Sequence, residues 1–357
     1  MRVLHLFGDW KWTGPSEPTL DLCLELRALG VQADLACLAP PPEASGSLLA
    51  RARDRGLEPR LDFRLERSVS IIKNLDDVKK IADACVDYDL LHVHFSHDHV
   101  VGGLGARRAG RVKVVRTNHK AIPTPKNIAT RYLYRKLTDG YITSSRAALD
   151  ADVSRFGLRG WHVDPAMRLG RFTPREAPHD GFNLGVVARV QKHRRFDVLL
   201  EGVKLAKVPD LRLIVVGRGT HIHEIAVEPA KRLGLTNVTF TGYLGDQYLD
   251  TLASFDALLF LVPGSDGTCR AVREAMAMGR AVIGARRGMI PEIVDDGKTG
   301  LVVDDTAENI ARAIERLAAD RAACREMGAA GREKALRLYD VKHQAAAVRD
   351  IYQRLLG

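Results

Sequence analysis

Short apolar runs rich in β-branched residues recur along the chain, and stretches with helical spacing separate them. The runs fall into two series. The first comprises 2–7, 33–39, 90–95, 113–118 and 140–145, and the second comprises 182–189, 212–219, 238–243, 257–263 and 281–286. Strands that alternate with helices form parallel sheets. The pattern therefore predicts an α/β protein with two doubly wound, Rossmann-like domains.

The segment 164–181 separates the two series. It is rich in Pro, Gly and charged residues and has no hydrophobic periodicity, as is typical of a boundary between domains. We therefore expect an N-terminal domain over 1–170 and a C-terminal domain over 171–338. Apolar residues at helical spacing predict a closing helix over 339–357, which we expect to pack back on the N-terminal domain. The length of 357 residues suits two domains of about 150 to 200 residues each.

Composition narrows the class of protein. Apolar residues make up 46% of the chain and charged residues 27%, values that fit a soluble globular protein of enzyme size. No run approaches the roughly 20 apolar residues of a membrane span, and the opening "MRVLHLFGDWKW" predicts a strand without the core of a signal peptide. We therefore expect a cytoplasmic protein. The five cysteines are scattered, with no C-x-x-C pair and no zinc spacing, so we expect reduced thiols and no metal site.

The net charge of +10 is concentrated in one segment. No acidic residue lies between Asp98 and Asp139, whereas that interval holds the basic residues Arg107, Arg108, Arg111, Lys113, Arg116, Lys120, Lys126, Arg131, Arg135 and Lys136. A solvated basic surface is one interpretation. An anionic membrane surface, an acidic acceptor and nucleic acid are the functional alternatives.

Polar residues follow several of the predicted strands. Ligands of doubly wound sheets bind outside the carboxyl ends of the strands. After the first strand, Gly14 precedes a helix start whose N–H groups could face an anion, although glycine opens many helices for steric reasons alone. His94, His97 and His99 follow the third strand and His119 follows the fourth, so we expect histidines to converge on a polar site.

The second series carries cations and carboxylates at the same kind of position. In "VARVQKHRRFDVLL", Arg189 ends a strand and Arg194 follows five residues later, before a helix; two guanidinium groups there suit a diphosphate. In "VPGSDGTCRAVREAMAMGRAVIG", Asp266 precedes Glu274 by eight residues at a turn between a strand and a helix. Asp266 alone could be a helix cap, but a cap does not account for Glu274.

With these motifs, the chain resembles the retaining glycosyltransferases of family 4 (glycosyl transferases group 1). The resemblance rests on Asp266 and Glu274 followed by "EAMAMGRAVIG", and on "RRGMIPEIVDDGKTGLVV". It implies the GT-B architecture, in which two Rossmann-like domains face each other across a cleft. It also implies retaining hexosyl transfer from a UDP- or GDP-sugar to a cell-envelope glycan or lipid-linked saccharide, without a cofactor or metal. From the basic residues between Arg107 and Lys136 we expect the cytoplasmic enzyme to be peripheral on the inner face of the membrane, and nucleic acid is not an expected partner.

The resemblance also assigns roles to individual residues. Arg189 and Arg194 would hold the donor diphosphate, and Gly14 would approach the same phosphates. Asp266 would face hydroxyls of the donor sugar and Glu274 the ribose, with His119 near the sugar. We assign catalytic roles to His119, Arg189, Arg194 and Asp266. The other residues assigned to donor binding are Gly14, Gly217, Tyr243, Leu244, Gly267, Thr268 and Glu274.

The chain departs from the family pattern at three places. The first acid is Asp266, one methylene shorter than the usual glutamate, which leaves the donor sugar open. The first loop has Gly14 followed by Pro15 where a glycine pair is usual, and the linker "DPAMRLGRF" lacks the Asn-Gly and Asp of the family. Two alternatives to a transferase also remain. One is a non-catalytic nucleotide- or anion-binding GT-B protein, and the other is a sugar-nucleotide epimerase, which would need further acid and base carboxylates.

Overall fold

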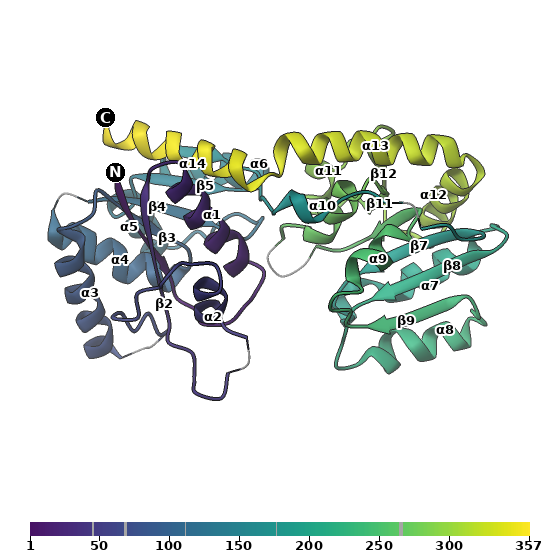
Figure 1. The fold of residues 1–357 in the computed structure, drawn as a ribbon, viewed down its shortest axis with the longest axis horizontal. Coiled ribbons are helices and arrows are strands. Elements are labelled where there is room, and N and C mark those ends of the chain that lie inside the picture. The colour runs from purple at the N-terminus through teal and green to yellow at the C-terminus, as the bar shows by residue number, and fades with distance from the viewer. Residues whose placement is uncertain (45, 68–69, 111, 176, 264–266) are drawn as a thin grey trace. The chain divides into compact units, whose positions relative to one another are not determined.

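The computed structural model describes residues 1–44, 46–67, 70–110, 112–175, 177–263 and 267–357 (Figure 1). The described chain divides into two compact units. The first consists of residues 1–168 and 340–357, and the second of residues 169–339. The chain thus passes between the units at 168/169 and 339/340, where the sequence led us to expect 170/171 and 338/339.

The first unit is built on a parallel sheet with the strand order β2-β1-β3-β4-β5-β6. Its strands are β1 (Arg2–Phe7), β2 (Gln32–Cys37), β3 (Leu90–Val93), β4 (Lys113–Asn118), β5 (Gly140–Thr143) and β6 (Gly160–His162). Its helices are α1 (Ser16–Ala28), α2 (Leu48–Arg53), α3 (Ile71–Cys85), α4 (Ser96–Ala109), α5 (Ile128–Lys136), α6 (Arg146–Phe156) and α14 (Val341–Leu356). The strand order reverses between β1 and β3, and such a switch point is where doubly wound folds bind ligands.

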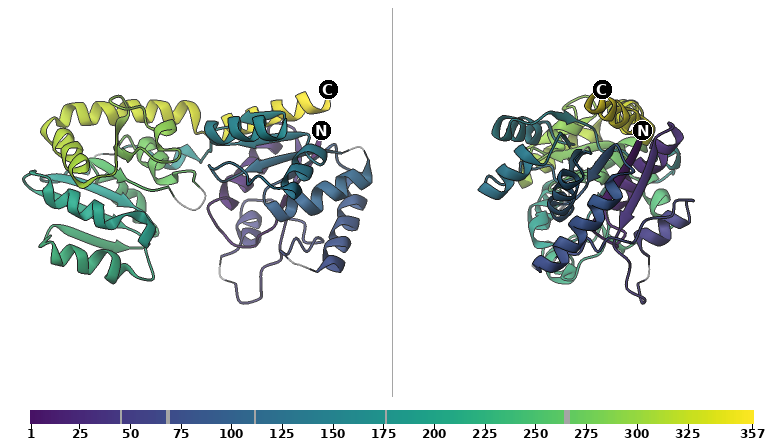
Figure 2. Two further views of the ribbon diagram at one scale, coloured as in Figure 1. Left: turned by 180° about the vertical axis from the view of Figure 1, so that it is seen from behind. Right: turned by 90° about the vertical axis from the view of Figure 1, so that its left-hand side faces the viewer.

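The C-terminal helix completes the core of the first unit. Helix α14 lies beside α1, as Figures 1 and 2 show. Its buried residues Val348, Ile351 and Tyr352 share one apolar cluster with Val3 of β1 and Leu20 of α1. This helix begins at Val341, three residues after the last helix of the second unit ends at Leu338.

The second unit is built on a parallel sheet with the order β12-β11-β10-β7-β8-β9. Its strands are β7 (Phe182–Val187), β8 (Leu211–Val216), β9 (Val238–Gly242), β10 (Ala257–Phe260), β11 (Ala281–Ala285) and β12 (Gly300–Val303). Its longer helices are α7 (Phe196–Leu205), α10 (Arg270–Ala277), α12 (Ala307–Ala319) and α13 (Arg321–Leu338), and its shorter ones are α8 (Glu228–Arg232), α9 (Tyr248–Ala253) and α11 (Ile290–Ile293). Here the order reverses between β7 and β10.

The sequence pattern did not predict the strands β6 and β12. Each is short, and each begins at a glycine that opens a strand at the edge of its sheet. Strand β12 depends on a side chain from outside the strand, because the Asp296 carboxylate accepts a hydrogen bond from the N–H of Val302 at 2.9 Å. The three residues of β6 are too few to show a period.

The carboxyl ends of β7, β8 and β9 are held in register by their backbones. Strands β7 and β8 pair from Phe182 with Leu211 to Val187 with Val216, so Ala188 and Gly217 follow side by side. Gly217 has a φ of 142°, and a Cβ there would lie 2.0 Å from the carbonyl oxygen of Ala188. Its N–H donates to the carbonyl of Gly242 at 2.9 Å. Only glycine satisfies both the conformation and the close approach at this position.

Candidate functional site

Arg189 is presented by a well-anchored loop at the carboxyl end of β7. The residues on either side are fixed by backbone hydrogen bonds, from Ala188 to Val216 at 3.0 Å and from Val190 to Arg218 at 2.9 Å. The Arg189 side chain is exposed and makes no hydrogen bond or ion pair with any residue that the structure describes. Its guanidinium group therefore has all its donors available to a ligand.

Arg194 joins the two loops that flank the switch point. It ends the short helix Lys192–Arg194 and is half-buried. Its Nη1 donates to the carbonyl of Val262 at 2.5 Å. Val262 follows β10, the strand beside β7, so this bond ties the loop after β7 to the loop after β10. The positive charge of Arg194 is thereby fixed at the edge where the strand order reverses.

Glu274 is held by two donors. It lies on α10 with 6% of its surface exposed. One carboxylate oxygen accepts from the Tyr248 hydroxyl at 2.5 Å, and the other accepts from Nε of Arg270 at 2.8 Å. Burial, together with the negative charge of Glu274, raises the pKa of Tyr248 well above its ordinary value, so the phenol keeps its proton and donates. A carboxylate has about four acceptor positions, so Glu274 can accept further hydrogen bonds.

Sequence reasoning missed both partners of Glu274. Arg270 stands one helical turn before Glu274, and this i,i+4 spacing of opposite charges is a signal that could have found it. Tyr248 comes from α9, in a different segment of the chain, and no spacing rule points to it.

The acidic turn is described only in part, because Asp266 lies outside the described residues. The segment after it bends sharply, with left-handed backbone at Gly267 (φ 69°) and Cys269 (φ 50°). Nε of Arg273 donates to the carbonyl of Thr268 at 3.1 Å. Helix α10 begins at Arg270, and the N-cap position is occupied by Cys269.

An exposed aromatic ring lies next to this edge of the sheet. Tyr243 follows β9 directly and has 69% of its surface exposed, while Leu244 after it is half-buried. The guanidinium carbon of Arg218 stands 4.7 Å from the centre of the Tyr243 ring. Arg218 follows Gly217, so the loops after β8 and β9 together present a cation and an aromatic surface.

In the first unit, Gly14 and His119 lie at the same kind of sheet edge. Gly14 is exposed in the turn before α1, and Ser16 closes that turn by accepting from the N–H of Thr13 at 2.6 Å. His119 follows β4, and its Nε2 lies 2.9 Å from Nδ1 of His94. Burial and the positive charge of Arg116 lower the pKa of His119 to about 3, so the ring is neutral at physiological pH.

The expected convergence of histidines is correct for His94 and His119 and wrong for His99. Nε2 of His99 is hydrogen-bonded to Thr138 at 2.7 Å, and its ring packs edge-on against Tyr134. The reason is helical geometry: His99 lies on α4, whose successive residues face different directions, whereas His94 directly follows β3.

The basic segment is less uniform than its sequence suggests. Arg116 is buried, with Nη1 3.4 Å from the carbonyl of Val93, and Lys113 forms an ion pair with Asp139 at 3.2 Å. Residue 111 lies outside the described residues. The exposed basic residues of the segment are Arg107, Arg108, Lys120, Lys126, Arg131, Arg135 and Lys136. None of the helices in the described ranges has the length and hydropathy needed to cross a lipid bilayer.

Two family profiles match the chain. The profile described as "Glycosyl transferases group 1" matches residues 172–334, and "Glycosyltransferase Family 4" matches residues 14–165. These two matches cover most of the second and the first unit respectively.

The curated relatives of the chain include two that align with more than half of it. It is 31% identical to D-inositol 3-phosphate glycosyltransferase of Nocardioides sp., over 57% of this chain and 50% of that protein. It is 30% identical to GDP-mannose-dependent alpha-(1-6)-phosphatidylinositol monomannoside mannosyltransferase of Mycolicibacterium smegmatis, over 65% of this chain and 67% of that protein. The first alignment thus spans only half the length of the relative.

The fold is similar to that of solved structures. HepE of Anabaena, crystallised in complex with UDP, superposes with a TM-score of 0.83 at 18% identity, covering 99% of this chain and 100% of HepE. At that identity the likeness concerns the fold alone, and it confirms the GT-B architecture predicted from the sequence. The family follows from the two profile matches and from the M. smegmatis relative. The chain belongs to the group 1 glycosyltransferases.

Proposed function

We propose that the protein is a retaining glycosyltransferase that moves a hexosyl group from a nucleoside diphosphate sugar to a glycan or lipid-linked acceptor of the cell envelope. The observation that carries this proposal is the pair of cations at the switch point of the second unit. Arg189 has no partner among the described residues, and Arg194 is fixed by its bond to Val262. Two guanidinium groups at such a place match the charge and geometry of a diphosphate.

The rest of the sheet edge fits a nucleoside. Glu274 is a buried carboxylate with acceptor positions to spare, which suits ribose hydroxyls. The exposed face of Tyr243, backed by Arg218, suits stacking with a base. The M. smegmatis relative is named as GDP-mannose-dependent and HepE was crystallised with UDP, so UDP- and GDP-sugars are the donors that we would test first.

The chemical role of the cations follows from where charge develops. Cleavage of the sugar–phosphate bond leaves positive charge on the sugar and more negative charge on the diphosphate. Arg189 and Arg194 would stabilise the leaving diphosphate more strongly than the intact donor, and this difference accelerates the reaction. We assign no protein nucleophile; the leaving phosphate would take the proton of the acceptor hydroxyl on the same face of the sugar, so that the anomeric configuration is retained.

The function is tested by turnover and by affinity. A panel of UDP- and GDP-sugars is screened for slow hydrolysis and for transfer, and nucleoside diphosphate binding is measured by calorimetry. Arg189→Ala is expected to weaken diphosphate binding by about 1.5 to 3 kcal/mol, the usual range for charge-assisted hydrogen bonds. The matched control is Arg212→Ala, an exposed arginine near the amino end of β8, at the opposite edge of the same sheet.

Each alternative has its own result. If the protein neither turns over any donor nor shifts its melting temperature with any nucleotide, a non-catalytic protein is favoured. Conversion of the free nucleotide sugar to its epimer would favour the epimerase. Retention is tested separately by NMR, because the anomeric coupling constant of the donor must reappear in the first product formed. Full activity in excess EDTA is expected, since the two arginines supply the charge that a metal would otherwise provide.

We also propose that the exposed part of the basic segment draws the enzyme to an anionic membrane surface. Helix α5 exposes Ile128 (90%) and Tyr132 (52%), which are one turn apart, next to Arg131 and Arg135. Apolar and aromatic residues beside cations are the composition of a helix that lies in a membrane interface. Each basic residue near an anionic surface contributes about 1 kcal/mol to binding.

A further inference from the structure

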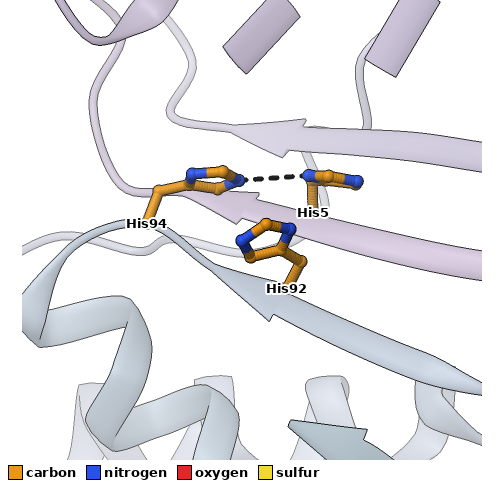
Figure 3. A group of neighbouring side chains, drawn as sticks. All are labelled: His5, His92 and His94. Carbon is orange, nitrogen blue, oxygen red and sulfur yellow. Dashed lines mark hydrogen bonds between the residues drawn. The ribbon is translucent and has the colours of Figure 1, made fainter. Parts of the chain in front are cut away.

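Three histidines lie together in the interior of the first unit, on the strands that flank its switch point. His5 belongs to β1, His92 to β3, and His94 follows β3; all three are at most 1% exposed (Figure 3). Nδ1 of His5 lies 3.1 Å from Nε2 of His94, the contact drawn as a dashed line in Figure 3. Burial of such a cluster would cost free energy of folding unless its polar atoms formed hydrogen bonds.

The cluster is part of a longer chain of hydrogen bonds. From His94 it continues to His119 at 2.9 Å. From His5 it continues in the other direction, across 3.5 Å, to the hydroxyl of Tyr352 on α14, which is its longest link. The hydroxyl of Tyr352 lies 2.5 Å from Nδ1 of His92, and Nε2 of His92 lies 2.6 Å from the hydroxyl of Thr117.

The geometry favours this chain over a metal site. The three imidazoles offer nitrogen atoms within 4.8 Å of one another. However, every ring nitrogen of the three already has a hydrogen-bond partner. The rings also stack: His92 and His94 have centroids 4.4 Å apart and planes inclined by 24°, so their faces meet instead of their lone pairs. The positive charge of nearby Arg116 would further oppose a cation.

All the imidazole rings in this series of hydrogen bonds are neutral. Burial lowers the pKa of His5 to about 3, and the pKa values of His92 and His94 are well below their ordinary range for the same reason. A neutral imidazole has one donor and one acceptor nitrogen. A ring that accepts a hydrogen bond at one nitrogen must therefore donate from the other. One donor thus determines the tautomer of every imidazole in this series of hydrogen bonds.

Tyr352 determines that direction. His92 cannot accept at both nitrogens, so only one of its two short contacts can come from a hydroxyl donor. A phenol is a much stronger acid than an aliphatic alcohol, so the Tyr352 hydroxyl donates to Nδ1 of His92, and Nε2–H of His92 donates to Thr117. The Tyr352 oxygen then accepts from Nε2–H of His5, and His5 accepts at Nδ1 from His94. His94 in turn accepts at Nδ1 from Nε2–H of His119.

We propose that Tyr352, His5 and His94 are positioning residues that hold His119 in one tautomer, with its proton on Nε2 and its Nδ1 open as a hydrogen-bond acceptor. The consequence rests on the function proposed above and on the family resemblance, which implies that His119 is near the donor sugar. His119 then accepts a hydrogen bond from a sugar hydroxyl and does not donate one. Deoxygenation of the matching hydroxyl would remove this interaction.

The proposal is tested on the ligand-free, full-length protein by nitrogen-15 NMR of its histidine side chains. In the unmodified protein, His119 is expected to show a pyrrole-type Nε2 and a pyridine-type Nδ1 across neutral pH. Tyr352→Phe removes the donor, and His119 should then show averaged nitrogen shifts from two tautomers. Tyr134→Phe is the matched control, because Tyr134 is a buried tyrosine of the same unit whose hydroxyl contacts Thr124 and no member of the chain.

Several results would overturn the proposal. A proton on Nδ1 of His119, or averaged shifts in the unmodified protein, would do so even if Tyr352→Phe failed to fold. Stoichiometric uptake of zinc, with loss of the pyridine-type signals of His5, His92 and His94, would show a metal site instead. These measurements need no substrate, so they stand whether or not the protein proves to transfer sugar. If it does, Tyr352→Phe should lower kcat several-fold while the KM for the donor changes little, and Tyr134→Phe should leave both unchanged.

Discussion

The hydroxyl of Tyr248 donates to the carboxylate of Glu274 across 2.5 Å and joins helix α9 to helix α10. Glu274 is therefore oriented before any ligand arrives. A charged acceptor that is already oriented loses little entropy on binding. Substitution of Glu274 is therefore the most direct test of nucleoside binding.

Glu274→Ala should weaken the free nucleoside diphosphate and the intact donor by the same amount, about 1.5 to 3 kcal/mol, because both present the same ribose. Tyr248→Phe keeps the carboxylate and removes only its orienting bond, so about 1 kcal/mol is expected. Calorimetry with both ligands measures these losses. If Glu274→Ala binds both ligands with unchanged affinity, Glu274 does not bind the ribose.

Asp266→Ala should behave differently, because the family resemblance implies that Asp266 faces hydroxyls of the donor sugar. The free nucleoside diphosphate should bind as before, whereas turnover of the donor should fall through misplacement of the sugar. Titration, steady-state rates and a melting curve are compared for the one variant. A loss of roughly 1 kcal/mol of stability with full turnover would mean that this acid has only a structural role.

Gly217→Ala should destabilise the second unit by about 2 to 4 kcal/mol, because the new methyl group meets the carbonyl of Ala188 and the backbone is left-handed. Gly245→Ala is the control: it lies in the loop after β9, where a Cβ would meet nothing within 4 Å. Urea unfolding measures both. Equal stability of the two variants would contradict the close approach of the two strand ends.

Acid should destabilise the first unit. The pKa values of His5 and His119 are about 3 in the folded protein and near 6.5 when unfolded, so each ring takes up about one proton on unfolding near pH 5. The free energy of unfolding should therefore have its full value above about pH 6.5 and decrease as the pH falls below that value. Urea titrations between pH 7.5 and about 4.5 measure the slope.

Asp98 works in the opposite direction and supplies the control. Burial raises its pKa to about 6, so the folded state binds a proton that the unfolded state releases down to about pH 4. This contribution is present at low pH and is lost as the pH rises through 6. Asp98→Asn should therefore make the acid loss of stability steeper between pH 6 and 4. A shallower slope in that variant would mean that Asp98 is ionised throughout.

Membrane binding is tested by flotation with liposomes. Arg131→Ala combined with Arg135→Ala should weaken binding to anionic liposomes by about 2 kcal/mol. Recovery with anionic liposomes should therefore fall, and recovery with neutral liposomes should stay unchanged. The matched control is Arg312→Ala with Arg316→Ala, an exposed pair at the same spacing on α12. Equal recovery of the unmodified protein with anionic and neutral liposomes at low salt would rule the docking out.

The alternation of apolar runs predicted both sheets, since the period of a buried parallel strand is visible in a single sequence. It also predicted that Arg189 follows the end of a strand and that Glu274 lies in the helix after a strand, as they do after β7 and β10. Tyr248 and Tyr352 escaped prediction because their partners lie in other segments, and only the folded chain brings them together. The burial of Arg116 was missed because the interpretation considered only its charge. Arg116 lies on β4, a strand in the interior of the sheet between β3 and β5.

The return of α14 to the first unit has a consequence for biosynthesis. The chain leaves this unit after residue 168 and comes back to it only at residue 340. A nascent chain on the ribosome therefore makes the whole second unit while the first still lacks Val348, Ile351 and Tyr352, which fill its apolar cluster. Until translation reaches α14, the first unit exposes the surface that this helix covers, and chaperones would find their binding site there.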